Sequence, residues 1–206
     1  MLVSEGMGRY MSAAFLLVLL SAGGFAQTSI LVNPDFEQGR PGARPLGWLF
    51  GFGPNKLSYS ALTVTDSCNS GKQCAVTKSN ELIPAGSHSL LYQYVDAKPY
   101  RNMKFRFRAA VRAKVSGSPD GAGLLVRIHR VGGESCFFNN MSDRRITSED
   151  WAFYEITGDV CADAANLEIG MQLWGTGNAW LDDASLVFVG SGAALLPKMT
   201  TALPNK

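Results

Sequence analysis

The sequence predicts an all-β protein of antiparallel strands, arranged as a sandwich or a barrel. Apolar and polar residues alternate with a period of two in nearly every segment, which is the spacing of a strand buried on one face. These short runs are separated by turns rich in Gly, Pro and Asn. No window of about a dozen residues shows the apolar spacing of an amphipathic helix. Many short strands without helices are typical of β-sandwiches and barrels.

The strongest alternation lies in Met103–Val115, where the odd positions from 105 onward are apolar and most of the even positions are Lys or Arg. The segment Gly121–His129 repeats this alternation. Between them, residues 116–121 read SGSPDG, which is a turn signal. The two strands are therefore predicted to form an antiparallel hairpin.

Further strands are predicted along the rest of the chain. They are Ile30–Phe36, Leu57–Thr65, Gln73–Lys78, Ser89–Asp96, Glu134–Phe138, Trp151–Val160, Leu167–Trp174 and Asn178–Val189. Residues 27–189 are expected to form one domain, which suits a chain of this length. Residues 190–206, rich in Gly, Ala, Pro and Thr, are predicted to be a flexible C-terminal tail.

The N-terminal residues 1–26 are predicted to be a secretory signal peptide. Arg9 precedes the apolar run AAFLLVLL, and Gly24-Phe25-Ala26 places small residues at the positions before a cleavage site. A membrane anchor is the alternative, but about 20 apolar residues are needed to cross a bilayer and this run is shorter. The expected location is therefore secreted or periplasmic, without stable membrane insertion.

The four cysteines are expected to form two disulfides, because an even number in an exported chain favours disulfides over metal ligation. Cys68 and Cys74 bracket a Ser-Gly turn, so we pair them and assign Cys136 to Cys161, one of three possible connectivities. Zinc is the competing interpretation. It is disfavoured because the sequence holds no Cys-x2-Cys pair and only two histidines.

Motifs at both ends of the chain resemble galactose-binding-like jelly-roll domains, a group that includes many bacterial carbohydrate-binding modules. At the N-terminal end, Asn33–Gly39 reads NPDFEQG and is followed by Gly47-Trp48. Towards the C-terminus, Leu167–Leu173 and Trp180–Leu186 look like the closing strands of such modules. The resemblance implies an all-β fold of two antiparallel sheets, a jelly-roll sandwich.

A narrower resemblance concerns the middle of the chain. Gly123–Arg127, Asn139–Arg144 and Asp150-Trp151 are similar to the accessory jelly-roll domain found beside tail-processing-type serine peptidases and transcriptional regulators. The sequence differs from those proteins in carrying neither a peptidase nor a regulator domain, and in its four cysteines.

The resemblance also implies a structural calcium ion, with Glu37 and Asp182 at the matching positions. Calcium takes six to eight oxygen ligands, which carboxylates and backbone carbonyls supply. The first and last strands of jelly rolls are often neighbours, so the two acidic segments are expected to meet. The alternative is that these acids solvate turns or pair with lysines. No redox or nucleotide cofactor is expected.

The basic strand suggests a ligand surface. If Arg106, Arg108, Arg127 and His129 share one face of adjacent strands, they form a cationic surface suited to the carboxylate or sulfate groups of an acidic glycan. The alternative is an ordinary solvated sheet face. The net charge of only +2 argues against a general polyanion binder and against nucleic acid as a partner.

Aromatic residues supply further candidates, because sugar rings stack on exposed Trp and Tyr side chains. Tyr92 and Tyr94 are two residues apart and are expected to share a face. Trp174 precedes a Gly-x-Gly turn. Most large aromatic rings of a sandwich lie in the core, which is the competing interpretation.

Three function classes follow from the sequence. The first is a secreted non-catalytic module that binds an acidic or a plant or microbial polysaccharide, with a glycan or cell-surface partner. The second is an accessory protein-interaction domain without a sugar site. The third is a jelly-roll polysaccharide lyase, although neither histidine lies in a recognisable nucleophile or metal motif.

Overall fold

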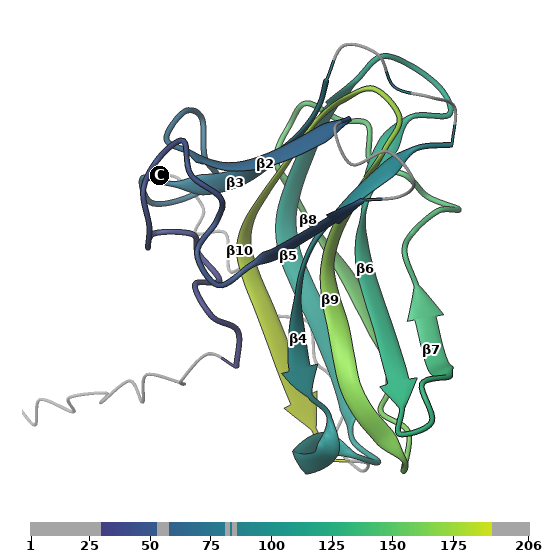
Figure 1. The fold of residues 1–206 in the computed structure, drawn as a ribbon. Helices are drawn as coiled ribbons and strands as arrows, with labels where there is room; N and C mark the ends of the chain where they lie inside the picture. The colour runs from purple at the N-terminus through teal and green to yellow at the C-terminus, as the bar shows by residue number, and fades with distance from the viewer. Residues whose placement is uncertain (1–29, 53–57, 81–82, 84–85, 191–206) are drawn as a thin grey trace, which may run out of the picture.

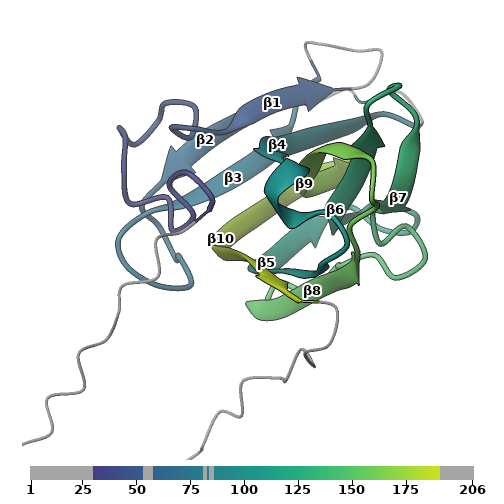
Figure 2. The same ribbon diagram turned by 90° about the horizontal axis from the view of Figure 1, so that it is seen from below.

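The computed structural model describes residues 30–52, 58–80, 83 and 86–190. The described chain forms two five-stranded antiparallel sheets stacked face to face, as the view from below shows (Figure 2). One layer, the front sheet, has the order β1 (Leu49–Phe52), β4 (His88–Asp96), β9 (Ala164–Trp174), β6 (Gly121–Arg130), β7 (Ser135–Asn139). The other, the back sheet, has the order β2 (Tyr59–Val64), β3 (Cys74–Ser79), β10 (Gly177–Val189), β5 (Lys104–Val115), β8 (Ala152–Asp159).

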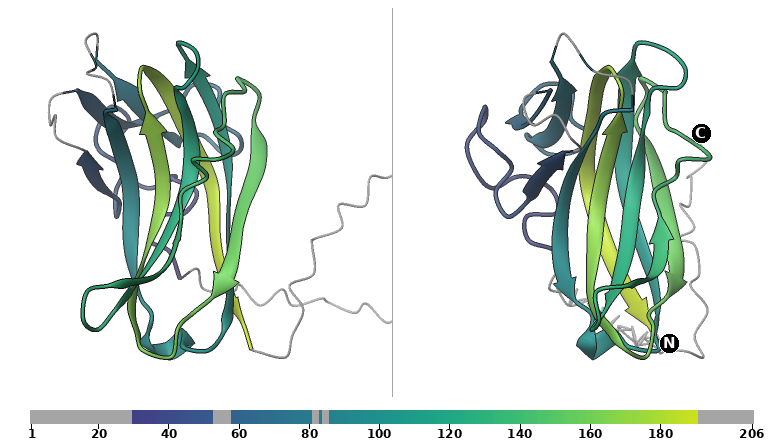
Figure 3. Two further views of the ribbon diagram at one scale, coloured as in Figure 1. Left: turned by 90° about the vertical axis from the view of Figure 1, so that its right-hand side faces the viewer. Right: turned by 45° about the vertical axis from the view of Figure 1, so that its right-hand side comes forward.

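The predicted two-sheet jelly-roll sandwich is thereby confirmed. The helical structure within the described residues is one short 3-10 turn, Lys98–Tyr100. The long strands of both sheets run along a common direction (Figure 1, Figure 3). The predicted signal peptide (1–26) and residues 191–206 of the predicted tail lie outside the described residues.

Alternating apolar side chains of the two sheets meet in one core. Phe105 and Phe107 of β5 and Leu124 and Ile128 of β6 are fully buried, as the alternation predicts. Each such side chain contributes about 1.5–3 kcal/mol when it is transferred from water into the core. The period-two pattern therefore identifies correctly which side of these strands faces inward.

The predicted hairpin of Met103–Val115 and Gly121–His129 is wrong. β5 pairs with β8 and β10, whereas β6 pairs with β7 and β9, so the chain crosses from one sheet to the other between them. Both strands have one apolar face, and these faces lie opposite each other in the core. Alternation specifies the buried face of a strand but not its neighbour.

The predicted strand Ile30–Phe36 is an irregular loop, and the described chain instead begins its sheet at β1. Asn33 and Phe36 have positive φ angles of 48° and 57°, which a strand does not allow. The Asn33 side chain donates to the carbonyls of Gln38 and Leu46, and its backbone carbonyl accepts the Trp48 indole N–H at 3.1 Å. Phe36 packs 5.0 Å from Trp48, ring centre to ring centre. The NPDFEQG and Gly-Trp motifs thus belong to one loop, which buries Asn33, Phe36 and Trp48 and exposes most of its other residues.

Both predicted disulfides are confirmed. Cys68–Cys74 closes a short loop that leads into β3, with 5.4 Å between Cα atoms. Cys136–Cys161 joins β7 of the front sheet to the segment that follows β8 of the back sheet, with 6.6 Å between Cα atoms. The second bridge therefore ties the two layers together at their edge.

Candidate functional site

The outer face of the front sheet carries a cleft of about 570 Å³, which we call the front cleft. It runs across all five strands of this sheet, whose long strands β4, β9 and β6 are seen side by side in Figure 1. The side chains that line it include His88, Leu90, Tyr92, Leu125, Arg127, Phe138, Asn140, Arg145, Glu168, Gln172 and Trp174. Aromatic, amide and charged groups thus surround one concave surface, which is the composition of a ligand site.

A glycine lies at the centre of the sheet beneath the cleft. Gly170 of β9 is buried between Tyr92 of β4 and Leu125 of β6 in the sheet register. A Cβ atom at this position would lie 2.0 Å from the Leu91 carbonyl oxygen, so a larger residue would displace the backbone of β4. On the same face of β9, Glu168 and Gln172 stand on either side of it and line the cleft.

Glu168 carries the buried negative charge of this face. It lies in register between Tyr94 on β4 and Arg127 on β6, and it is only 6% exposed. Its Oε2 is 3.6 Å from Arg127 Nη1 and 3.3 Å from His129 Nε2. Partial burial, and next the charge of Glu168, raise the pKa of the Tyr94 hydroxyl above its usual value. The carboxylate therefore offsets the positive charge of the groups beside it.

Aromatic rings bound the cleft on several sides. Tyr92 and Tyr94 make an edge contact with ring centres 5.3 Å apart. The Arg127 guanidinium lies 4.7 Å from the Phe138 ring centre, and that of Arg145 lies 4.6 Å from the Trp174 ring centre. These stacked cations hold the rings in place and leave their own N–H groups near the cleft.

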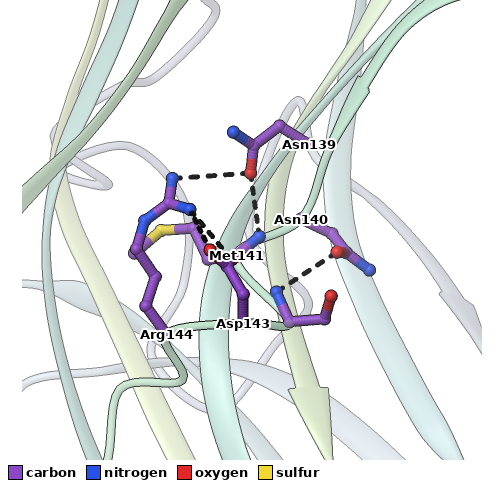
Figure 4. A network of polar contacts seen from close by, with 6 residues as sticks. Asn139, Asn140, Met141, Asp143 and Arg144 are labelled. Carbon is purple, nitrogen blue, oxygen red and sulfur yellow. Dashed lines mark hydrogen bonds and ion pairs between the residues drawn. The ribbon is translucent and has the colours of Figure 1, made fainter.

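The loop after β7 forms one wall of the cleft, and its polar contacts hold its shape (Figure 4). Asn139 Oδ1 accepts the Met141 backbone N–H at 3.0 Å, and Arg144 pairs with Asp143 at 2.9 Å. Asn140 donates across the cleft edge to Gln172 Oε1 at 3.3 Å. The network therefore presents the Asn140 amide to the cleft from a fixed backbone.

The structure brings together most of the predicted ligand residues. Tyr92, Arg127 and Trp174 line the front cleft. Tyr94 and His129 lie on the same face and line a neighbouring hollow. For these five residues, the predicted shared surface exists in the fold.

Arg106 and Arg108 are the exception, and their predicted place beside Arg127 is wrong. They belong to β5 in the back sheet, so they lie on the opposite side of the sandwich from the cleft. The Arg108 guanidinium stacks 3.6 Å from the Phe153 ring centre of β8. The single cationic surface that the hairpin would have formed is split between two sheets.

Several lining residues were missed from the sequence: Glu168, Gln172, Phe138, Asn140 and Arg145. The alternation of Leu167–Leu173 indicates that Glu168 and Gln172 face outward, but it does not say that they meet Arg127 or Asn140. Phe138 follows Phe137, and only the structure shows that Phe137 packs on Phe105 in the core while Phe138 faces the cleft.

Glu37 and Asp182, the predicted calcium ligands, do lie at one place, where the N-terminal loop meets β10. The Pro34 carbonyl accepts the Ala184 backbone N–H at 2.9 Å. The loop closed by Cys68–Cys74 then supplies N–H donors to both carboxylates. Glu37 Oε1 accepts from residues 72 and 73 at 2.7 and 2.8 Å, and Asp182 Oδ2 accepts from residues 69 and 70 at 3.0 and 3.1 Å.

This donor set does not fit a calcium ion. The second oxygen of Asp182 accepts the Asp183 N–H at 2.8 Å, so both of its oxygens face N–H dipoles rather than an open coordination site. Gly71 has a φ of +58°, and a Cβ there would lie 2.2 Å from Glu37 Oε1. Among the described residues, no group of three or more His, Cys, Asp or Glu side chains is placed to hold a metal. Backbone N–H groups thus stabilise the negative charges of Glu37 and Asp182.

Solved structures that share this architecture include several carbohydrate-binding modules. The CBM22-1 xylan-binding domain of Paenibacillus barcinonensis Xyn10C matches with a TM-score of 0.54 and 15% identity, over 78% of this chain and 93% of that one. A family 16 carbohydrate-binding module matches with a TM-score of 0.53 and 15% identity, over 77% of this chain and 99% of its own. The chain has the galactose-binding-like jelly-roll fold. The enzymatically active domain of the bacteriophage CBA120 tailspike protein 4 matches as well, with a TM-score of 0.57 and 13% identity, over 78% of this chain and 21% of that one.

Among curated proteins, the jelly roll is similar to the uncharacterized HTH-type transcriptional regulator YbfP of Bacillus subtilis. The identity is 27% over 137 residues, which is 66% of this chain and 45% of YbfP. The chain thus spans less than half the length of this relative. No protein-family model matches the sequence. Within the described residues, no helix has the length and hydrophobicity needed to cross a membrane.

Proposed function

We propose that this jelly roll is a binding module for a neutral glycan, which it holds in the front cleft. The observation that carries the proposal is the cleft itself: aromatic rings at its sides, with carboxylate and amide groups within reach of a sugar's hydroxyls. Sugars combine apolar ring faces with many hydroxyl groups, so a site of rings and hydrogen-bonding groups matches their chemistry. The carbohydrate-binding modules that share this fold support the same function.

The charges in the cleft favour a neutral over an acidic glycan. An acidic ligand would need free cations, but the two arginines that line the cleft are engaged: Arg127 lies beside the buried Glu168, and Arg145 stacks on Trp174 and donates to the Pro119 carbonyl. A carboxylate on the ligand would compete with Glu168 and be repelled by it. The acidic-glycan hypothesis also required Arg106 and Arg108 on this surface, and they lie on the back sheet. A neutral chain meets no such repulsion.

The lyase hypothesis receives less support from this geometry. Such an enzyme would use cations to neutralise the carboxylate of its substrate, whereas here Glu168 already pairs with them. The protein-interaction hypothesis calls for a flat or filled face, and the front sheet is hollowed instead.

Secretion is part of the proposal. Disulfides persist in oxidising compartments, and the two bridges agree with the predicted signal peptide. An export assay with the native N-terminus, followed by mass spectrometry of the medium or periplasm, tests this point. The expected product begins at Gln27.

Affinity electrophoresis tests the binding proposal. The purified protein is run in gels that contain soluble xylan, mannan or cellulose ether, with polygalacturonate as the acidic comparator. We expect retardation by at least one neutral polymer, at low and at high salt alike, and loss of retardation in Tyr92→Ala. Arg108→Ala on the back sheet is the control: its own mobility in a polymer-free gel differs because it has lost a charge, but the polymer should retard it, relative to that gel, as much as it retards wild type. Binding to polygalacturonate alone, or its cleavage to unsaturated products, would overturn the neutral-glycan proposal.

A further inference from the structure

A second hollow of about 550 Å³ lies at the other end of the same front-sheet face. Its lining includes Tyr94, His129, Val131 and Asn166. Asn166 lies in register between Asp96 of β4 and His129 of β6. It is two residues from Glu168 along β9, so both side chains belong to one face of the strand.

Aromatic rings connect the two hollows. Tyr92 lines the front cleft, and its ring centre is 5.3 Å from that of Tyr94, which lines the second hollow. Tyr94 in turn is 6.5 Å from the ring centre of His129. The Tyr94 ring is 54% exposed although it lies in the middle of a sheet face. A ligand that leaves the front cleft in this direction therefore meets an exposed ring rather than a barrier.

The second hollow contains an unused hydrogen-bonding group. Asn166 lines the hollow, and its Oδ1 is buried without a hydrogen-bond partner among the described residues, which is unfavourable; a ligand can satisfy this oxygen if the amide turns it towards the hollow. A sugar hydroxyl can donate to an amide oxygen and can also accept from an amide nitrogen. Arg130, the cation of this hollow, is held by Asp163 at 2.5 and 2.6 Å. The hollow thus offers a ring and an amide rather than a free cation, which suits a neutral, hydroxylated ligand.

We propose that this second hollow is a further sugar subsite, and that the ligand is a linear neutral polysaccharide that extends along β9 from Trp174 to Asn166. This inference rests on the proposed glycan-binding function and adds the ligand's length and direction to it. Eight residue steps along a strand correspond to roughly 26 Å. A site of this length binds an internal stretch of a chain, whereas a site limited to the front cleft would also be saturated by short oligosaccharides.

Calorimetric titration with di-, tetra- and hexasaccharides of the xylo-, manno- and cello-oligosaccharide series tests the proposal. We expect affinity to rise with length up to the hexasaccharide in at least one series. Asn166→Ala should lower hexasaccharide affinity by about five- to tenfold, with the disaccharide affinity unchanged. Tyr94→Ala should also lower hexasaccharide affinity, but it contacts Tyr92 of the front cleft, so the disaccharide comparison is made with Asn166→Ala. Phe153→Ala, an exposed aromatic on the back sheet, is the matched control and should change neither value. Thermal unfolding of each variant separates a binding defect from a folding defect.

The outcomes distinguish this inference from the function on which it rests. If no oligosaccharide or polysaccharide binds, the proposed function itself is wrong. If hexasaccharides bind no better than disaccharides, or if Asn166→Ala weakens all lengths equally, glycan binding stands and the second subsite is wrong.

Discussion

Glu168 Oε2 lies 3.3 Å from His129 Nε2 and 3.6 Å from Arg127 Nη1, so one buried carboxylate contacts both an imidazole and a guanidinium on the front-sheet face. This arrangement decides the charge that a ligand meets there. The Glu168 side chain is 7% exposed, against 38% for Arg127, so solvent reaches the arginine more readily than the acid.

Replacement of Glu168 tests the role of this carboxylate. In Glu168→Gln, Arg127 and His129 lose their counter-charge while the size of the side chain is kept. We expect weaker binding of the neutral glycan and tighter binding of polygalacturonate at low salt, by about 1 kcal/mol or roughly fivefold. Affinity electrophoresis at two salt concentrations measures both changes. Unchanged preference between the two polymers would contradict the electrostatic argument.

Arg108→Ala tests whether the back sheet takes part in glycan binding. The guanidinium stacks on Phe153 of the back sheet, so its removal should lower the free energy of unfolding by about 0.5–1 kcal/mol. Glycan affinity should stay at the wild-type value, because the front cleft lies on the other face. Chemical denaturation and titration calorimetry provide the two readouts. A large loss of affinity with unchanged stability would place a ligand on the back sheet instead.

The Cys68–Cys74 bridge is expected to stabilise the loop whose backbone N–H groups donate to the Glu37 and Asp182 carboxylates. Cys68→Ala/Cys74→Ala should lower the free energy of unfolding by about 2 kcal/mol in the chain-entropy treatment of short loops. A further loss follows if residues 69–73 no longer donate to the two carboxylates. Denaturation under oxidising conditions, compared with wild type, measures the sum. A stability equal to that of wild type would show that the loop keeps its shape without the bridge.

Asp182 is expected to make stability depend on pH. Burial raises the pKa of Asp182 to about 6, although the backbone N–H groups of residues 69, 70 and 183 act in the opposite direction. Between about pH 4 and 6 the folded protein therefore binds this proton more tightly than the unfolded chain does. It follows that the free energy of unfolding falls by about 2–3 kcal/mol for this group alone as the pH rises through this interval. Above the interval it is constant.

Denaturation curves between pH 4 and 7 measure this effect. Asp182→Asn removes the titrating group, so its unfolding free energy should change less over the interval than that of wild type. The comparison concerns the slopes, because the amide also alters the contacts with the loop. Parallel curves for the two proteins would contradict the raised pKa.

Calcium is expected to have little effect on this protein. The oxygens of Asp182 accept backbone N–H groups, and these dipoles point the wrong way for a cation. The melting temperature should therefore be the same in EDTA and in excess calcium chloride. A clear rise of the melting temperature in calcium chloride, abolished by Glu37→Gln, would instead support the calcium site that the sequence resemblance implies.

Local patterns in the sequence predict the all-β class, the buried side of most strands and one disulfide connectivity of the three possible. Period-two alternation is a local property, because successive side chains of a strand point to opposite faces. It was sufficient to assign Phe105 and Phe107 to the core and Arg127 and His129 to the surface. Cys68 and Cys74 bracket a short turn, which is also a local feature and favours the pairing that the structure contains.

Only the tertiary structure decided which strands are neighbours. The same alternation allows β5 and β6 to pair in one sheet or to face each other across the core, and the second arrangement separates Arg106 and Arg108 from Arg127 by a whole sandwich. It also brings Glu168, nearly forty residues from His129 in sequence, beside that ring. Strand pairing depends on contacts between distant segments, and a local pattern carries no information about them. The front cleft is formed by the order of the strands in the front sheet, so its residues could be brought together only by the fold as a whole.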